Sequence, residues 1–188
     1  TTYVTKVFDF STNVEAVCHF VRSVGQTYGG DTPECYELVL KNARSLSWQA
    51  GKAKVLVMIG DDVPHEPDYR ENVDNIDWRN ELALLREAGI NVYGVHAMPG
   101  TRRHSKWFYE EIARATGGYY LTLDQFAAIT DIIFAICYKQ SGNDALRNFQ
   151  EEVQSQHRMS RNMADIFSTL SGFRVHVEEA THDLVPVP

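Results

Sequence analysis

The feature that most constrains the fold is a continuous apolar run at residues 54–59, KVLVMI, which stops at Gly60. A strand with apolar residues on both faces is typical of a parallel sheet that other elements cover on both sides. Asp61 and Asp62 follow this run directly. The carboxyl ends of parallel strands share one rim, and ligands of α/β proteins bind there. The run therefore predicts a buried strand and places two carboxylates at a candidate site.

Strand and helix patterns alternate from this run onward, which predicts an α/β fold with a doubly wound, mainly parallel sheet. The predicted strands are residues 3–10, 54–59, 90–97 and 119–123. The predicted helices are residues 14–24, 33–46, 78–88, 105–116 and 124–138. An average sheet has five or six strands, so we expect that a central strand is missing from this set.

Composition supports a globular domain and excludes two classes of partner. The chain has 188 residues, of which 44% are hydrophobic, enough for a substantial core. Its formal net charge is -7, and no basic cluster is interleaved with aromatic residues, which argues against a nucleic-acid surface. No apolar run approaches the roughly 20 residues that a membrane span needs.

The cysteines and the first residue bear on the origin of the chain. The three cysteines Cys18, Cys35 and Cys137 are a sparse and odd set, which argues against a disulfide framework. We expect buried free thiols, and these favour an intracellular compartment. Thr1 is not Met and already lies beside a predicted strand, so the chain is interpreted as a fragment or a processed product.

Residues 140–188 are predicted to be a helical extension with a short strand and a tail, separate from a domain at residues 1–139. Residues 141–171 contain neither Pro nor, after Gly142, any Gly, and they read as one long helix. Two interpretations are open: an ordinary helix docked on its own domain, or a helix that binds a partner or a second copy of the chain. The heptad-like seam for such a partner is Leu146, Phe149, Val153, Met163, Phe167 and Leu170.

Oxygen donors occur in two loops that should meet at the rim. Thr32 and Asp61 are hard donors that suit Mg²⁺, or alternatively Ca²⁺ or Mn²⁺. Asp31 and Asp62 are neighbours that would support these ligands from a second layer. Gly29 and Gly30 allow the backbone to turn tightly beside the metal. The alternative interpretation is structural: a turn that starts a helix, and an acidic pair that caps a loop.

These loops resemble those of a known family. The string YGGDTPE at residues 28–34, followed by VLVMIGDDVPH at residues 55–65, resembles a von Willebrand factor type A (vWA) domain over roughly residues 1–139. The GGD-x-PE loop is similar to that of intracellular and hemicentin-like vWA domains. The resemblance implies a six-stranded sheet with helices on both faces and a metal-ion-dependent adhesion site. Thr32 and Asp61 match the second and third loops of that site, where an acidic side chain of the partner completes the metal coordination.

One part of the family pattern is missing. The first strand of the family carries Asp-x-Ser-x-Ser and lies in the middle of the sheet, and no such motif occurs here; DFST at residues 9–12 is the nearest string. The resemblance therefore implies an N-terminally truncated domain. Upstream sequence, another chain or a rearranged strand such as residues 173–179 would fill the slot. Thr32 and Asp61 alone would hold a metal weakly, so an unoccupied site in this fragment is part of the expectation.

The expected function is a non-enzymatic protein–protein interaction or adhesion module that binds an acidic side chain of a protein partner. A structural assembly component with a vestigial metal site is one alternative. A metallohydrolase built on Asp61, Asp62 and His65, with His96 and His104 near the same rim, is another, as is a domain attached to a kinase. Neither a GxSxG motif nor a P-loop or kinase signature occurs in the sequence.

Overall fold

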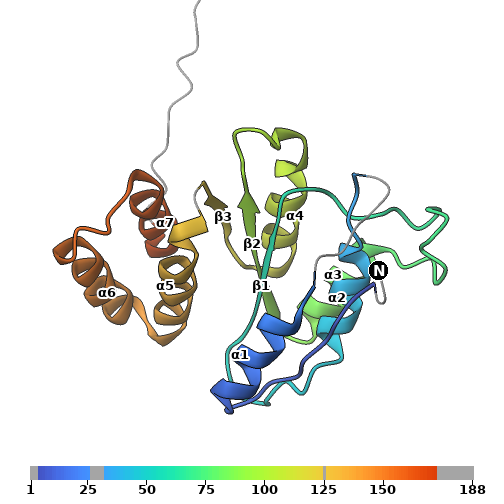
Figure 1. The fold of residues 1–188 in the computed structure, drawn as a ribbon, viewed down its shortest axis with the longest axis horizontal. Coiled ribbons are helices and arrows are strands. Elements are labelled where there is room, and N and C mark those ends of the chain that lie inside the picture. Colours follow the sequence, from blue (N-terminus) through green and yellow to red (C-terminus); the bar gives the residue numbers. More distant parts are fainter. Residues whose placement is uncertain (1–3, 26–31, 125, 173–188) are drawn as a thin grey trace, which may run out of the picture.

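In the part of the chain that the structure describes, three parallel strands form the sheet, and the second strand lies in the middle (Figure 1). The structure is a computed structural model that describes residues 4–25, 32–124 and 126–172. Strand β1 (Lys54–Gly60) pairs with β2 (Ile90–Ala97), with Gly60 opposite His96. Strand β3 (Tyr120–Leu123) pairs with the other edge of β2, with Thr122 opposite His96. The parallel sheet predicted from the sequence is confirmed for these strands, and their carboxyl ends share one rim.

Helices cover both faces of the sheet (Figure 1). Ile90 and Val92 of β2 belong to one core, and Tyr93 and Val95 belong to the other. Helices α2 (Tyr36–Arg44), α3 (Trp78–Glu87) and α4 (Lys106–Thr116) contribute to the first core. Helices α5 (Ile129–Ser141), α6 (Asn143–Ser155) and α7 (Arg161–Ser171) contribute to the second. Two short 3-10 helices are η1 (Arg103–Ser105) and η2 (Phe126–Ala128).

Strand β1 is less covered than its sequence predicted. Its boundaries are confirmed, and Met58 is buried, but Ile59 is 41% exposed. The reason is its place in the sheet, because β1 pairs only with β2 among the described strands and forms an edge. The strand that is buried on both sides is β2.

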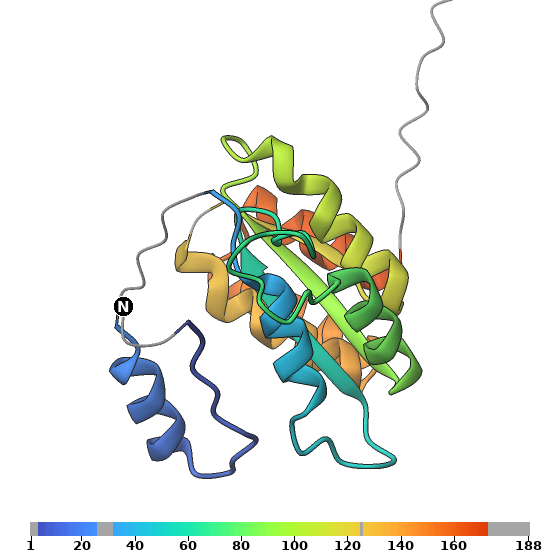
Figure 2. The ribbon, with the colours of Figure 1, turned by 90° about the vertical axis from the view of Figure 1, so that its right-hand side faces the viewer.

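The N-terminal segment differs from the prediction of a strand at residues 3–10. Its described part contains no strand, since it has no neighbouring strand among the described residues to pair with. The segment instead lies along α1 (Val14–Ser23), and Phe8 stacks on Phe20 of that helix. Helix α1 starts after Asn13 as predicted, but it buries no residue. Figure 2 shows α1 apart from the layered body, whereas the segment before it contacts the body through a hydrogen bond from Ser47 N to Asp9 and through the rings of Phe10 and Trp48.

The long C-terminal helix predicted at residues 141–171 is two helices. The break lies between α6 and α7, where His157 has a positive φ of 58° and the Ser160 hydroxyl accepts a hydrogen bond from Met163 N. The six apolar residues predicted as a partner-binding seam are buried in the core on the α5 side of the sheet. They pack in one cluster with Val95 and Leu121, so the described part of the extension is docked on its own domain. These six residues are Leu146, Phe149, Val153, Met163, Phe167 and Leu170.

The cysteines are more exposed than the sequence suggested. Cys18 and Cys137 are exposed and Cys35 is half-buried, so the prediction of three buried thiols is wrong. Cys18 lies on α1, which buries no residue, and Cys35 is the N-cap residue just before α2, whose buried residues are Glu37, Leu40 and Ala43. Within the described ranges, no helix combines the length and the apolar character needed to cross a bilayer. The strand expected at residues 173–179 lies outside the described residues.

Candidate functional site

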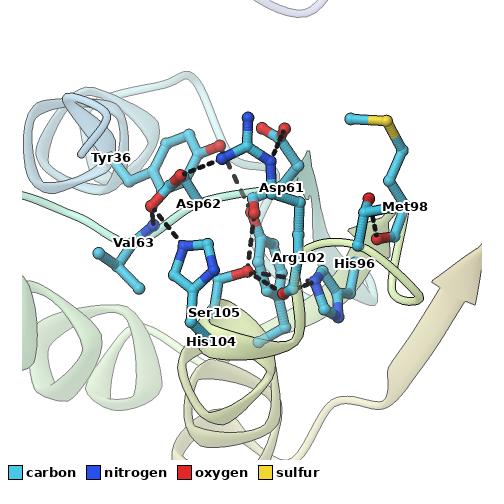
Figure 3. Close-up of polar contacts among 11 residues, drawn as sticks. Tyr36, Asp61, Asp62, Val63, His96, Met98, Arg102, His104 and Ser105 are labelled. Atoms are coloured by element: carbon cyan, nitrogen blue, oxygen red, sulfur yellow. Dashed lines mark hydrogen bonds and ion pairs between the residues drawn. The ribbon is translucent and has the colours of Figure 1, made fainter. Parts of the chain in front are cut away.

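Three loops meet at the carboxyl ends of β1 and β2 (Figure 3). The loop before α2 joins the loop after β1, because Glu34 N donates a hydrogen bond of 2.8 Å to Val63 O. The loop after β2 joins the same region from the other side, where Ser105 Oγ donates to Asp61 O at 2.7 Å. The three loops therefore form one connected rim, as the sequence predicted for parallel strands.

A guanidinium lies between the two rim carboxylates (Figure 3). Arg102 Nε is 3.2 Å from Asp61 Oδ2, and Arg102 Nη1 is 3.2 Å from Asp62 Oδ2. The other oxygen of Asp62, Oδ1, accepts a hydrogen bond from Val63 N and lies 3.2 Å from His104 Nε2. Asp62 is buried, and every oxygen of its side chain faces a nitrogen donor. Burial of this carboxylate is therefore matched by hydrogen bonds and positive charge.

His96, at the end of β2, holds the following loop in place through a hydrogen bond to its backbone. Its ring is fully buried, with Nε2 3.0 Å from Arg102 O and Nδ1 3.1 Å from the Tyr120 hydroxyl. A carbonyl only accepts, so Nε2 carries the proton and Nδ1 accepts from the Tyr120 O–H. Burial lowers the pKa of His96, and the ring is therefore neutral near pH 7. Because Ser105 Oγ lies 3.1 Å from Nε2 and donates to Asp61 O, the histidine ties the two loops together.

A layer of aromatic rings supports the rim. Tyr109 stacks on His96 with ring centroids 4.9 Å apart, and its hydroxyl donates to the Tyr36 hydroxyl at 3.3 Å. Burial raises the pKa of both tyrosines, so they stay neutral at physiological pH. Gly60 leaves room for these rings, since a Cβ there would lie 2.0 Å from the Tyr36 hydroxyl oxygen. The charged groups of the rim thus rest on a neutral, close-packed layer.

His65 is hydrogen-bonded to Glu37 of α2. Its ring Nδ1 is 3.3 Å from Glu37 Oε1, its backbone N–H donates to Glu37 Oε2, and its ring stacks on Tyr69. Glu37 is almost fully buried. The hydrogen-bonding pattern therefore directs His65 to Glu37, and it does not place His65 in the carboxylate cluster that the hydrolase alternative requires.

The predicted ligands are only partly brought together. Asp61 and Asp62 lie at the rim, and Thr32 is exposed on the segment that Glu34 joins to Val63. Gly29, Gly30 and Asp31 lie outside the described residues. Among the residues that are described, no three His, Cys, Asp or Glu side chains are grouped to hold a metal ion.

The donor set around Asp61 and Asp62 does not fit a divalent cation. Mg²⁺ and Ca²⁺ need about six oxygen ligands, whereas three of the four carboxylate oxygens here face nitrogen donors. The Arg102 guanidinium would also repel a cation at the same carboxylates. The expected Mg²⁺, Ca²⁺ or Mn²⁺ therefore stays a prediction that depends on ligands beyond the described residues.

Sequence reasoning missed Arg102 and Ser105. Each makes its rim contact with a residue 40 or more positions away, so no local spacing reveals the pairing. The available signal was positional: residues 98–105 follow β2, and the loop after a parallel strand lies at the same rim as the loop after its neighbour. Two adjacent arginines in such a loop are candidates for the counter-ions of Asp61 and Asp62.

Comparison with known proteins identified no relative of this chain. A scan against models of protein families matched none, and searches of curated proteins and of solved structures also found no significant match.

Proposed function

We propose that this chain is a non-enzymatic protein-interaction module with a doubly wound, vWA-like architecture, and that its rim binds an acidic side chain of a protein partner. The observation that carries this proposal is the convergence of three loops at the carboxyl ends of β1 and β2, with the partly exposed side chains of Arg102 and His104 held in place by Asp62. Ligands of α/β sheets bind at this rim. The similarity of residues 28–34 and 55–65 to vWA loops supports the same location.

The geometry favours binding over catalysis. Ser105 and His96 lie 3.1 Å apart and could suggest a nucleophile with its base. However, Ser105 is fully buried and donates its proton to Asp61 O, and His96 Nε2 donates to Arg102 O. The hydroxyl therefore has neither a substrate-facing position nor a base to take its proton. Asp62, the carboxylate required by the hydrolase alternative, is buried and paired.

A structural assembly component with a vestigial metal site is the second candidate. The specific observation in its favour is the position of Arg102, which supplies positive charge where a metal would otherwise lie between Asp61 and Asp62. In this case the module would bind partners without a divalent cation. The intracellular location and the link to a kinase domain stay predictions.

Peptide display on the full 188-residue chain tests the proposed function. We expect selection from a random peptide library to enrich sequences that contain Asp or Glu, and we expect Thr32→Ala and Asp61→Ala to weaken their binding. Lys52→Ala is the matched control, because Lys52 is exposed just before the start of β1, at the opposite end of the sheet. Enriched peptides that lack acidic residues, or that bind the rim variants and the control equally, would contradict the proposal.

A further inference from the structure

We infer that the Arg102 guanidinium, and not a bound metal ion, is the cation that binds a carboxylate of the partner at this rim. The inference rests on the proposed function, because it names the group that would recognise the acidic side chain. It concerns a ligand of one chemical class, the side-chain carboxylate of Asp or Glu in a peptide.

Arg102 is held in place from two sides. Asp61 fixes Nε, and Asp62 fixes Nη1. Nη2 makes no hydrogen bond to the described residues, whereas Nε and Nη1 face the two aspartates (Figure 3). The side chain is 37% exposed. A guanidinium has five N–H donors in a rigid fork that matches a carboxylate, so Arg102 retains donors for a ligand after it has bound both aspartates.

Preorganisation makes this arginine a better ligand site than a mobile surface arginine. A free arginine side chain loses rotamer freedom when it binds, which costs about 0.5–1.5 kcal/mol for a flexible side chain. Here the buried Asp62 already orders the Arg102 side chain, and the hydrogen bond from His96 to Arg102 O already orders its backbone. Binding of a carboxylate therefore loses less entropy at Arg102 than at an unconstrained position.

The outward face of the loop is basic, although the chain as a whole is acidic. Residues 102–106 read RRHSK, and Arg103, His104 and Lys106 are exposed. Lys106 is paired with Glu110, while the carboxylate of Asp62 is buried beneath Arg102. The first turn of α4 contains no acidic residue, so the positive end of its helix dipole adds to this charge. Asp61 is the rim carboxylate that stays partly exposed, and it is paired with Arg102 Nε.

A divalent cation would compete with Arg102 for the same oxygens. Both ions would need Asp61 Oδ2 and Asp62 Oδ2, and the two positive charges would repel each other at close range. A guanidinium, in contrast, has five N–H donors, and Nε and Nη1 alone face the two aspartates, so donors remain for a further carboxylate. The arrangement thus predicts recognition that does not depend on a divalent metal.

NMR titration of the full chain tests the inference at the proposed atom. The readout is the arginine ¹⁵Nε–H resonances, titrated with the peptides Ac-Gly-Glu-Gly-NH₂ and Ac-Gly-Gln-Gly-NH₂, each with EDTA and with excess Mg²⁺. We expect the Glu peptide to shift the Arg102 resonance equally in both conditions, and the Gln peptide to leave it unchanged. A shift that requires Mg²⁺, or equal shifts with both peptides, would overturn the inference.

Substitutions of Arg102 distinguish the effect of its positive charge from the effect of its guanidinium geometry. We expect Arg102→Lys to weaken Glu-peptide binding about tenfold, because loss of one charge-assisted hydrogen bond corresponds to about that change in Kd. Arg114→Lys is the control, since Arg114 is exposed and paired with Glu111 at the far end of α4. If removal of Arg102 charge impairs folding, the double variant Arg102→Gln/Asp62→Asn removes the buried charge as well. Wild-type affinity in either Arg102 variant would overturn the inference.

Failure of this inference and failure of the proposed function give different results. Glu-peptide binding at the rim that requires Mg²⁺ would retain the proposed function and reject the role of Arg102. No response of any rim resonance, with or without Mg²⁺, would reject both.

Discussion

At Gly94, in the middle of β2, the backbone of α4 lies directly against the sheet. A Cβ at Gly94 would lie 2.5 Å from Tyr109 O, a backbone atom that cannot rotate away. We expect Gly94→Ala to lower the free energy of unfolding by about 1–3 kcal/mol through overpacking, measured by urea denaturation. Gly100→Ala is the control, because nothing lies within 4 Å of its Cβ position. Equal stability of the two variants would show that α4 can move off β2.

His96 should make the stability of the chain depend on pH. Burial lowers its pKa below the ordinary value of 6.5, so the unfolded chain binds a proton more readily than the folded chain. Its contribution to stability is therefore complete above pH 6.5 and is lost as the pH falls through the pKa of the folded state. We expect the free energy of unfolding to decrease between pH 7 and pH 5, measured by urea denaturation at each pH.

The His96→Gln variant isolates this effect from that of the carboxylates. Its amide can still donate to Arg102 O, so the slope of stability against pH should become shallower, whatever the change at pH 7. His19→Gln is the control, because His19 is exposed on α1. A slope in His96→Gln as steep as in the unmodified chain would assign the pH dependence to other groups. The titratable or charged groups that face His96 are Asp61, Arg102, His104, Tyr109, Glu110 and Tyr120.

At the scale of elements, two helix caps with the same chemistry should differ in their effect. Asn13 accepts a hydrogen bond from Ala16 N at the start of α1, and Ser160 accepts one from Met163 N at the start of α7. Helix α1 buries no residue, whereas α7 buries Met163 and three further residues. We expect Ser160→Ala to lower the global free energy of unfolding by about 1 kcal/mol, and Asn13→Ala to leave it nearly unchanged.

Hydrogen exchange tests whether α1 opens independently of the core. Asn13→Ala should speed exchange of the α1 amides while the amides of β2 keep their protection, because local opening of an uncovered helix does not require global unfolding. An equal loss of global stability in the two cap variants would mean that α1 belongs to the cooperative core.

Helices α6 and α7 should unfold together with the sheet. Phe167 is buried in the same cluster as Val95 of β2, whereas Phe134 on α5 is 49% exposed. We expect Phe167→Ala to cost about 3–5 kcal/mol and Phe134→Ala to cost much less, both in a single unfolding transition seen by circular dichroism and by tryptophan fluorescence. Two separate transitions in Phe167→Ala would instead indicate an independent extension.

At the scale of the whole molecule, the edge of β1 that pairs with no strand of the described residues should promote self-association. Unpaired strand edges bind other chains, particularly where the edge is apolar, and Ile59 on β1 and Ile133 and Phe134 on α5 are partly exposed. We expect sedimentation velocity of the 188-residue chain to show association that grows with concentration and that Ile59→Lys reduces. Val73→Lys is the control, because Val73 is 82% exposed in a loop. A chain that stays monomeric throughout, or an equal effect of both lysines, would contradict this expectation.

Much of the layered body could be predicted because its signals are local. The apolar run that ends at Gly60 marks β1, and Gly89 stops α3 with a positive φ of 70° immediately before β2. The six apolar residues of the predicted seam are buried, but in the core of the chain itself. The second of the two helices begins after Ser160, which is the N-cap of α7. A continuous helix was predicted there because neither Pro nor Gly interrupts the pattern.

The rest depends on neighbours that the sequence does not specify. Residues 4–10 have the composition of a strand, but a strand also needs a hydrogen-bonded partner, and none lies beside them in the described chain. Asp61 and Asp62 were predicted at the rim from their place after β1. Their counter-ion Arg102 lies 40 residues after Asp62, and only the folded arrangement brings the three side chains together.

The order of the sheet, β1-β2-β3, is also the order of the chain. Each strand therefore docks beside the strand that was synthesised immediately before it, with one helix between them. Lys54 pairs with Ile90 and Gly94 pairs with Tyr120, so each parallel pairing closes a loop that contains a whole helix. Pairing over such separations is slow, but each strand meets a partner that has already left the ribosome, so the sheet can grow in the direction of translation from β1 to β3.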